Sequence, residues 1–377
     1  MFKKVAKISM IIVVVFLFLG ILAKQFLVES APITAEEVEA EPVAQEITEI
    51  KEVFLTISAI GDCALGTEYA QRGHTFATVF AENKEDCSYF LANVRDVLAQ
   101  DDLTIANLET CLTTASQRRD KSSAQAAYWI KGEPLYAQIL VEGSVEVVNV
   151  ANNHTYDYRE VGYRETLRSL EKVGIAYCGF EHVLIKEMKG IKVGFLGFNQ
   201  FGNKGVWQAY SALKAQVAES IQALCEQTDL VIVSFHWGNE REIRPSQKQY
   251  ELAKTAIEAG ADLVLGHHPH VLQGIKEYKG KQVVFSLGNF CFGGNRLPYD
   301  RDTIIYQQTF VFVEGELVRT TNKIIPCSMT TGAGYNDFQP KVLEGAEAQR
   351  VLNKVKERSE MINFKAERNK TRENVPS

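Results

Sequence analysis

The sequence of 377 residues predicts an α/β fold in which helices cover a layered, largely parallel sheet. Short apolar runs rich in β-branched residues alternate with longer segments whose apolar residues have helical spacing. The runs are almost continuously apolar, which is typical of strands that are buried on both faces. Several runs are followed by polar residues, at the end of parallel strands where ligands collect.

The elements follow in order along the chain. The predicted strands are 53–60, 103–109, 145–152, 192–198, 229–236 and 261–268. The predicted helices are 88–100, 161–173, 211–227 and 246–259. Gly260 ends the last helix, as a glycine often does. Two further segments, 281–290 and 303–325, are rich in β-branched and aromatic residues and predict antiparallel strands that cover or extend the sheets.

The N-terminal residues do not look like part of a core. Three lysines within residues 1–7 precede an uncharged apolar run, so 1–7 are predicted to be cytoplasmic and 8–28 to be a transmembrane anchor. This pattern predicts a single-pass membrane protein with an external domain. A cleavable signal is the alternative, although Pro32 stands directly after the best small-residue site and makes cleavage there poor.

Composition divides the rest of the chain. Residues 29–52 hold eight glutamates against one lysine and predict an acidic linker. Residues 53–341 have a globular composition without an internal repeat and predict one domain, and 342–377 predict a C-terminal helix with a frayed tail. The net charge is −6, and the linker alone accounts for it. The nearly neutral domain argues against a nucleic-acid partner.

Polar side chains of metal-binding types follow five of the predicted strands. Each alone has an ordinary explanation as a turn residue, a helix cap or a hydrogen-bonded core histidine. Because the carboxyl ends of parallel strands meet at one edge of a sheet, we expect these side chains to converge. They are Asp62, Asn107, Glu109, Asn152, Asn153, His154, Asp157, His236, Glu240, His268 and His270.

The stretch "GHHPH" holds three of the seven histidines. His268 and His270 flank Pro269, and a segment around proline tends to be extended, so these two imidazoles are predicted to start on the same side. His267 is predicted to point away from them and to pack or hydrogen-bond rather than bind metal. Imidazoles with carboxylates and a carboxamide suit Mn, Fe or Zn ions.

The seven cysteines cannot all pair within one chain, and no CxxC motif occurs. A disulfide-built scaffold is therefore excluded. Cys63 and Cys111 lie one or two residues beyond Asp62 and Glu109, so we expect both thiols near the same edge and close enough to form a disulfide.

Six motifs in this order resemble the CapA (PgsA) family of bacterial capsule-synthesis proteins, and the resemblance covers residues 54–330. The motifs are "AIGDCALG", "ANLET", "ANNHTYDY", "SFHWGNE", "GHHPHVLQ" and "FSLGNF". That family is associated with synthesis and export of poly-γ-glutamate capsules. It is similar to the calcineurin-like metallophosphoesterases, so the resemblance implies a four-layer α/β/β/α sandwich with two divalent metal ions.

The resemblance also implies a role for each matching residue. Glu109 occupies the place of the carboxylate that bridges two metals, and His154 that of the acid that assists the leaving oxygen. The implied metal ligands are Asp62, Glu109, Asn153, His236, His268 and His270. The chain departs from the phosphoesterase pattern at Ala64, where a histidine ligand is usual, and at Glu109, where aspartate is usual. Arg159 stands where the family often has glycine.

Two functions follow as alternatives. The first is metal-assisted hydrolysis in capsule biosynthesis, with His154 as the general acid. The second is a non-catalytic subunit of a membrane synthase or export complex that binds the polymer, which the incomplete first motif favours. Both imply an acidic surface polymer or its precursor as a partner, and both place the protein at the outside of a bacterial cell membrane. The basic stretch 116–121 is suited to attract such an anion.

Overall fold

The computed structural model describes residues 51–122, 127–202 and 208–365. The predicted segments 1–7 and 8–28 and nearly all of the predicted linker 29–52 lie outside these residues. Among the described residues, no helix is both long and apolar enough to cross a membrane. The prediction of a single-pass membrane protein is therefore wrong for the part of the chain that the structure describes.

The larger sheet joins segments from both ends of the described chain. Its strand order is β17 (Lys341–Val342), β16 (Glu316–Ser328), β15 (Asp302–Val313), β1 (Glu52–Ala64), β3 (Leu103–Leu108), β6 (Val147–Asn149) and β7 (Ala176–Cys178), with β14 (Asn289–Phe292) also paired to β1. The strands from β1 to β7 in this order run parallel. The hairpin of β15 and β16 adds antiparallel strands, as the segment 303–325 predicts.

The second sheet is built from the middle of the chain. Its strand order is β12 (Ile275–Tyr278), β13 (Lys281–Val284), β11 (Leu263–His267), β10 (Leu230–His236), β9 (Ile191–Asn199) and β8 (Leu184–Met188). The four central strands are parallel, and β8 and β12 are antiparallel edges. A small third sheet contains β2 (Thr67–Glu68), β5 (Ile130–Gly132) and β4 (Cys111–Leu112).

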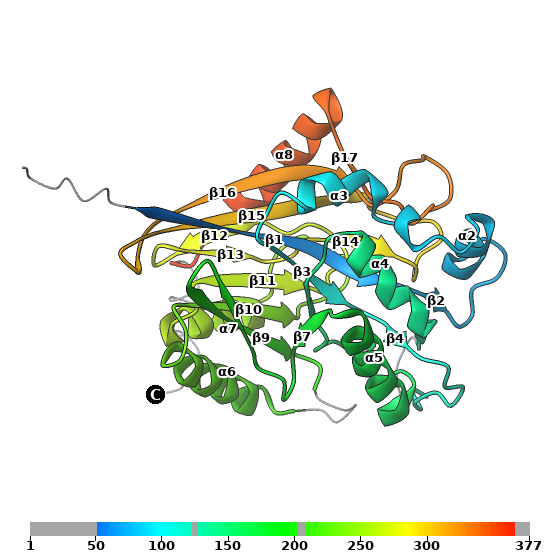
Figure 1. Ribbon diagram of the computed structural model, residues 1–377, viewed down its shortest axis with the longest axis horizontal. Helices are drawn as coiled ribbons and strands as arrows, with labels where there is room; N and C mark the ends of the chain where they lie inside the picture. The colour runs from blue at the N-terminus through cyan, green and yellow to red at the C-terminus, as the bar shows by residue number, and fades with distance from the viewer. Residues whose placement is uncertain (1–50, 123–126, 203–207, 366–377) are drawn as a thin grey trace, which may run out of the picture. The chain divides into compact units, whose positions relative to one another are not determined.

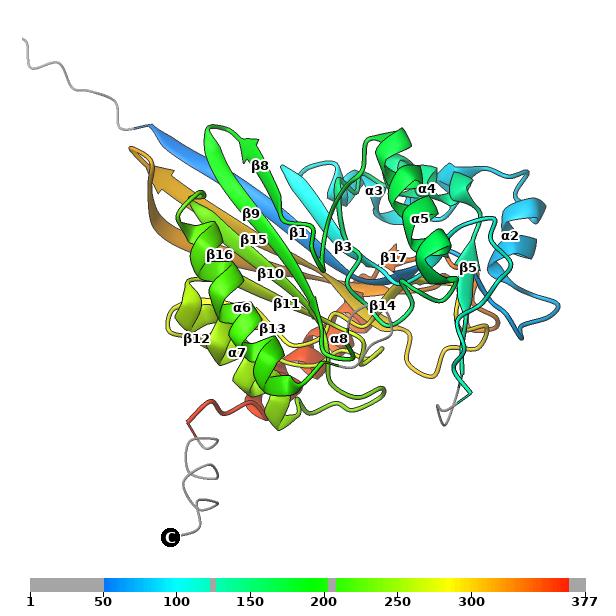
Figure 2. The ribbon, with the colours of Figure 1, turned by 90° about the horizontal axis from the view of Figure 1, so that it is seen from below.

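The hydrophobic clusters show how sheets and helices are layered. One cluster includes Leu55 and Phe310 from the larger sheet and Phe195 and Ile232 from the second, so it fills the space between them. The other face of the larger sheet packs against α2 (Phe76–Glu82), α3 (Ala92–Leu98), α4 (Ala137–Glu142) and α5 (Arg159–Val173). The other face of the second sheet packs against α6 (Tyr210–Cys225) and α7 (Gln247–Ala259). Figures 1 and 2 show these helix groups, and the predicted α/β class is confirmed.

Helix boundaries follow local chemistry where the signals are strong. The side chain of Ser246 accepts a hydrogen bond from the backbone N–H of Gln249, whose side chain accepts one in return, and Gly260 ends α7 with a φ of 119°. The predicted helix 88–100 is instead divided into a short 3₁₀ helix, η1 (Cys87–Tyr89), and α3. Phe90 and Leu91 are both buried between them, so packing interrupts the helix there.

The last helix, α8 (Gly345–Glu360), is attached by a group of charges at the start of β15. Val351 and Val355 of α8 enter the core between the sheets. The Arg350 guanidinium donates to both carboxylate oxygens of Asp302 at 2.6 and 2.7 Å, and Lys354 contacts the same carboxylate. Although burial opposes it, hydrogen bonds from Arg350 and Lys354 lower the pKa of Asp302 below its usual value.

Replacing Asp302 with asparagine should lower the free energy of unfolding by about 1–3 kcal/mol at pH 7, the usual value of hydrogen bonds to a charged group. A carboxylate whose pKa is lowered on folding stabilises the fold above its unfolded pKa of about 3.9, and this contribution is lost as the pH falls through the lower folded value. Urea unfolding at pH 7 and at pH 3 should therefore show a difference between wild type and Asp302→Asn that shrinks at pH 3. Glu347→Gln is the control, because Glu347 forms an exposed pair with Arg350 and should change little.

Candidate metal centre

Close contact between β1 and the turn before β14 places Asp62. A Cβ at Gly61 would lie 2.1 Å from the carbonyl oxygen of Gly288, so only glycine allows the two backbones to approach. Gly288 itself has a φ of 72°, and its carbonyl accepts the backbone N–H of Asp62 at 2.9 Å. Asp62 is thus held at the end of β1 with its side chain fully buried.

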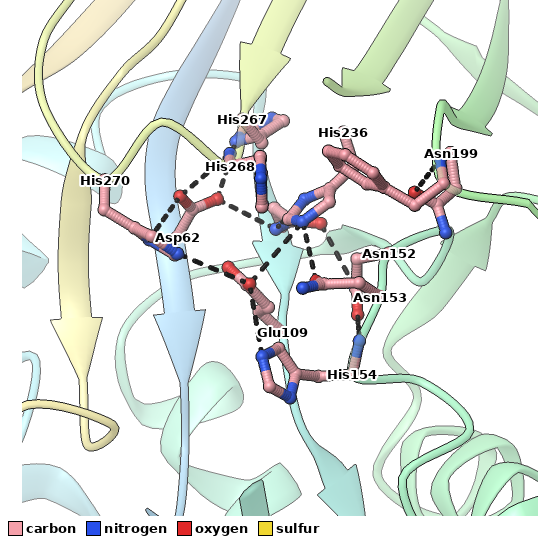
Figure 3. Close-up of polar contacts among 12 residues, drawn as sticks. Asp62, Glu109, Asn152, Asn153, His154, Asn199, His236, His267, His268 and His270 are labelled. Atoms are coloured by element: carbon pink, nitrogen blue, oxygen red, sulfur yellow. Dashed lines mark hydrogen bonds and ion pairs between the residues drawn. The ribbon is translucent and has the colours of Figure 1, made fainter. Parts of the chain in front are cut away.

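Polar side chains from both sheets meet at the carboxyl ends of the parallel strands (Figure 3). Asp62 lies on β1, Glu109 directly follows β3, and His236 is the last residue of β10. The Nδ1 atom of His270 lies 3.4 Å from Oδ2 of Asp62, and its Nε2 atom lies 3.8 Å from Oε1 of Glu109. Oε1 of Glu109 is also 3.5 Å from Nε2 of His236. The convergence predicted from the strand ends is therefore present in the fold.

The side chains form overlapping groups whose ligand atoms all lie within 4.8 Å of one another. One group is Glu109, His236 and His268, and another is Asp62, Glu109 and His270. Asn153 adjoins the first group, with its Oδ1 atom 2.9 Å from Nε2 of His236. All six residues predicted as ligands thus lie together, and Glu109 belongs to both groups. Their roles as ligands remain predictions.

The residues fit a divalent cation. Both carboxylate oxygens of Glu109 and the Nδ1 atom of His268 are buried without a hydrogen-bond partner among the described residues. Buried polar atoms are rarely left in this state, since each costs free energy that a bound ion offsets. Imidazole, carboxylate and carboxamide donors suit first-row metals such as Mn, Fe or Zn.

Burial and neighbouring charges shift the ionisation of these groups. Burial lowers the pKa of His236 well below its usual value and that of His268 to about 3, so both are neutral imidazoles, the form that binds metal. Burial also raises the pKa of Glu109 well above its usual value. Although burial opposes it, the carboxylates of Glu109 and Asp62 raise the pKa of His270 to about 10.

His154 lies beside the groups and is oriented by an acidic residue. Its Nδ1 atom is 2.6 Å from Oδ2 of Asp157, and its Nε2 atom is 3.9 Å from Oε1 of Glu109. The Lys121 ammonium pairs with Asp157 at 2.5 Å, and the backbone N–H of Ile130 donates to it at 2.8 Å. The ring of His154 is therefore held with Nε2 toward Glu109. Sequence reasoning placed Asp157 at this edge but gave it no role; its position three residues after His154 was the available signal.

The prediction that His267 points away from the other site residues is wrong. Its Nδ1 atom lies 3.3 Å from Oδ1 of Asp62, and the residue is only 2% exposed. The prediction assumed an extended segment, in which neighbouring side chains alternate. His268 and His270 instead have φ values of 94° and 57°, which turn the backbone so that all three imidazoles face the site.

Two asparagines at the site were not predicted as ligands, although Asn107 was among the residues expected to converge there. The side-chain amide of Asn107 donates to Oδ1 of Asp62 at 2.8 Å, and Oδ1 of Asn289 lies 2.8 Å from Nδ1 of His270. Asn107 ends a predicted strand, and Asn289 belongs to the "SLGNF" motif, so both were visible in the sequence. Asn107 thus orients Asp62, and Asn289 orients His270, without being a candidate ligand itself.

The disulfide suggested for Cys63 and Cys111 is not formed. Both are free, fully buried thiols, and Cys111 donates to the carbonyl of Thr155 at 3.0 Å. Burial raises the pKa of each to about 12, so neither is a reactive thiolate.

A cavity of about 410 Å³ opens in front of His154. It is lined by Lys121, Tyr128, Asn153, His154, Glu240 and Arg241. Of the predicted basic stretch, Lys121 therefore reaches the cavity, whereas the Arg118 guanidinium stacks 3.6 Å from the centre of the Tyr69 ring. The cavity gives a solvent-accessible path to the buried groups, with two cationic side chains on its wall.

The fold and the site together define an α/β protein with a buried centre suited to divalent metal. Residues 56–294 match the family described as bacterial capsule synthesis protein PGA_cap, and the chain belongs to this family. The resemblance to CapA-type proteins is thus confirmed.

Curated relatives agree with this membership. The chain is 27% identical over 255 residues to capsule biosynthesis protein CapA of Bacillus anthracis, covering 63% of this chain and 60% of that protein. It is 29% identical over 252 residues to PGA biosynthesis protein CapA of Bacillus subtilis (strain 168), covering 63% of each. The chain thus matches about three fifths of the length of these relatives.

Similar solved structures include a hypothetical protein from Thermus thermophilus, with a TM-score of 0.41, 17% identity and coverage of 72% of this chain and 99% of that one. The 5′-nucleotidase of Candida albicans has a TM-score of 0.39, 14% identity and coverage of 81% and 58%. Likeness at this level supports no statement about chemistry.

Proposed function

We propose that this chain is a metal-dependent hydrolase of capsule biosynthesis, acting on an acidic polymer such as poly-γ-glutamate or on its precursor. The observation that carries the proposal is Glu109, whose two oxygens are fully buried without a hydrogen-bond partner among the described residues, between two groups of candidate ligands. The order of layers and the motif set support a metallophosphoesterase type of fold. The names of the curated relatives support the polymer.

The ligand residues would hold two divalent ions. Glu109, Asn153, His236 and His268 would hold one, and Asp62, Glu109 and His270 the other. Such ions act as Lewis acids that polarise a phosphoryl or similar electrophile. Asn107 and Asn289 orient Asp62 and His270, so that the donors are arranged before an ion arrives.

The remaining residues act on the substrate. Asp157 accepts a hydrogen bond at Nδ1 of His154 and leaves Nε2 facing the cavity, where it can give a proton to a leaving oxygen. Lys121 and Arg241 on the cavity wall attract an anionic substrate.

A second candidate function is binding of the polymer without turnover, as a subunit of a synthase or export complex. Ala64 favours it, because it stands where the phosphoesterase pattern has a histidine ligand, and the group of Asp62, Glu109 and His270 contains no other histidine.

The test is the metal content of the purified full-length chain, followed by assays with phosphomonoester, phosphodiester and γ-glutamyl substrates. We expect bound divalent metal and hydrolysis of one of these classes that stops on chelation and returns with metal. Metal without turnover in any class would favour the binding function. A chain that takes up no divalent metal would contradict both the hydrolase and the metal centre.

A further inference from the structure

One of the two candidate metal groups is short of donors. Asp62, Glu109 and His270 offer three side chains, which is the number of protein ligands in a catalytic zinc site, whereas Mn or Fe sites take more ligands. Position 64, two residues after Asp62 on β1, cannot supply another. Ala64 is fully buried against Ile130, Phe292 and Met329, and its carbonyl accepts the backbone N–H of Gly293 at 2.8 Å.

Glu240 offers a further carboxylate next to His270, the histidine of this group. It lies on the loop after β10, and its carboxylate forms a third group with His268 and His270, in which all ligand atoms lie within 4.8 Å of one another. These two histidines belong to the two other groups, so Glu240 stands next to both candidate ion positions. Nδ1 of His268 is buried and has no hydrogen-bond partner among the described residues, which leaves this nitrogen able to bind a cation.

The backbone holds Glu240 in this place. The N–H of Arg241 donates to the carbonyl of Pro269 at 2.8 Å, which ties the loop to the residue between His268 and His270. Gly238, with a φ of 81°, makes the turn that brings the loop back after β10. Among the described residues no lysine or arginine lies within ion-pair distance of the Glu240 carboxylate, although Lys121 and Arg241 line the same cavity.

We propose that Glu240 is a metal ligand that completes the centre from its cavity side, next to His268 and His270. This inference rests on the proposed function, because it needs the metal centre. Glu240 is the exposed member of the ligand set, and it lines the cavity together with His154. It would therefore bind the ion from the side on which the substrate enters.

The test is binding of Mn²⁺ alone to the full chain after removal of metal, measured by calorimetry and by the metal retained on desalting. Wild type is expected to bind two ions. Glu240→Gln should weaken one of them by about tenfold or more, since even residues behind the ligands change affinity by 10–100-fold. Glu242→Gln, two residues further along the same exposed loop and outside all three groups, should bind as wild type.

A second measurement does not depend on affinity. With Co²⁺ as the probe, the visible absorption spectrum reports the ligands of the ion, and it should change in Glu240→Gln and stay unchanged in Glu242→Gln. Circular dichroism of the metal-free variants checks that both are folded. We expect them to be, because both side chains are exposed and neither substitution disturbs the core.

The outcomes separate the two proposals. If wild type binds Mn²⁺ and Glu240→Gln binds it with the same stoichiometry, affinity and Co²⁺ spectrum, Glu240 is not a ligand and the proposed function stands. If both variants lose affinity equally, the effect is general surface charge and the inference is overturned. If wild type binds no divalent ion, the proposed function and the inference fail together.

Discussion

Replacing His154 with alanine should reduce hydrolysis by about 10²–10⁴-fold while the bound metal stays nearly unchanged, because a general acid contributes a rate factor of this size. His154 touches the centre only at its edge, with Nε2 3.9 Å from Glu109, and its other nitrogen is occupied by Asp157. The measurement is turnover per bound metal ion on the substrate class found in the screen.

His268→Ala is the matched comparison for His154→Ala. Both remove one buried imidazole, but His268 belongs to the ligand groups and His154 does not. His268→Ala should therefore lose metal and activity together. If the His154→Ala protein keeps both its metal and its full activity, His154 is not the general acid. The polymer-binding function would then explain the site better.

Replacing Glu109 with glutamine should have opposite effects on metal binding and on stability. Glu109 belongs to two ligand groups, so metal affinity should fall at least about a hundredfold, the upper range for residues that only support ligands. The metal-free protein should become more stable at pH 7, because glutamine removes a buried charge, although its amide has no more hydrogen-bond partners than the carboxylate had. Burial of Glu109 and repulsion from nearby Asp62 are both relieved when its charge is removed.

Urea unfolding in the presence of a chelator measures this stability, and Asp157→Asn is the control. Asp157 is equally buried, but its carboxylate is paired with His154, Lys121 and the N–H of Ile130. Removing that charge should destabilise the fold. If Glu109→Gln proves as destabilising as Asp157→Asn, then Glu109 is a satisfied structural residue and the case for a metal centre is lost.

Local sequence was sufficient for most helices and strands near the site. The predicted strands 103–109, 229–236 and 261–268 correspond to β3, β10 and β11, with ends that differ by at most two residues. Their continuous apolar runs are diagnostic because both faces of a central strand are buried. The segment 145–152 yields only the short β6, which ends at Asn149.

The sequence alone was also sufficient to predict that the six candidate ligands lie close together. This was possible because parallel strands deliver their carboxyl ends to a common edge, whatever the order of the strands. It could not show how the histidine segment turns. The φ values of His268 and His270 are imposed by surrounding contacts, among them the bond from Arg241 to Pro269, so His267 faces Asp62 instead of pointing away.

The sequence by itself thus determined the α/β class, the family and the residues gathered at the strand ends, because these depend on local apolar patterns and short motifs. Only the tertiary structure decided how the strands divide between two sheets, which rests on pairings such as β1 with β15, far apart in the chain. It also brought Lys121 beside Asp157 and fixed how closely Glu240 approaches His268 and His270, which the strand ends predicted only to converge. The distance between two loops that are far apart in the chain depends on how the layers of sheets and helices pack. No local pattern of residues encodes this distance.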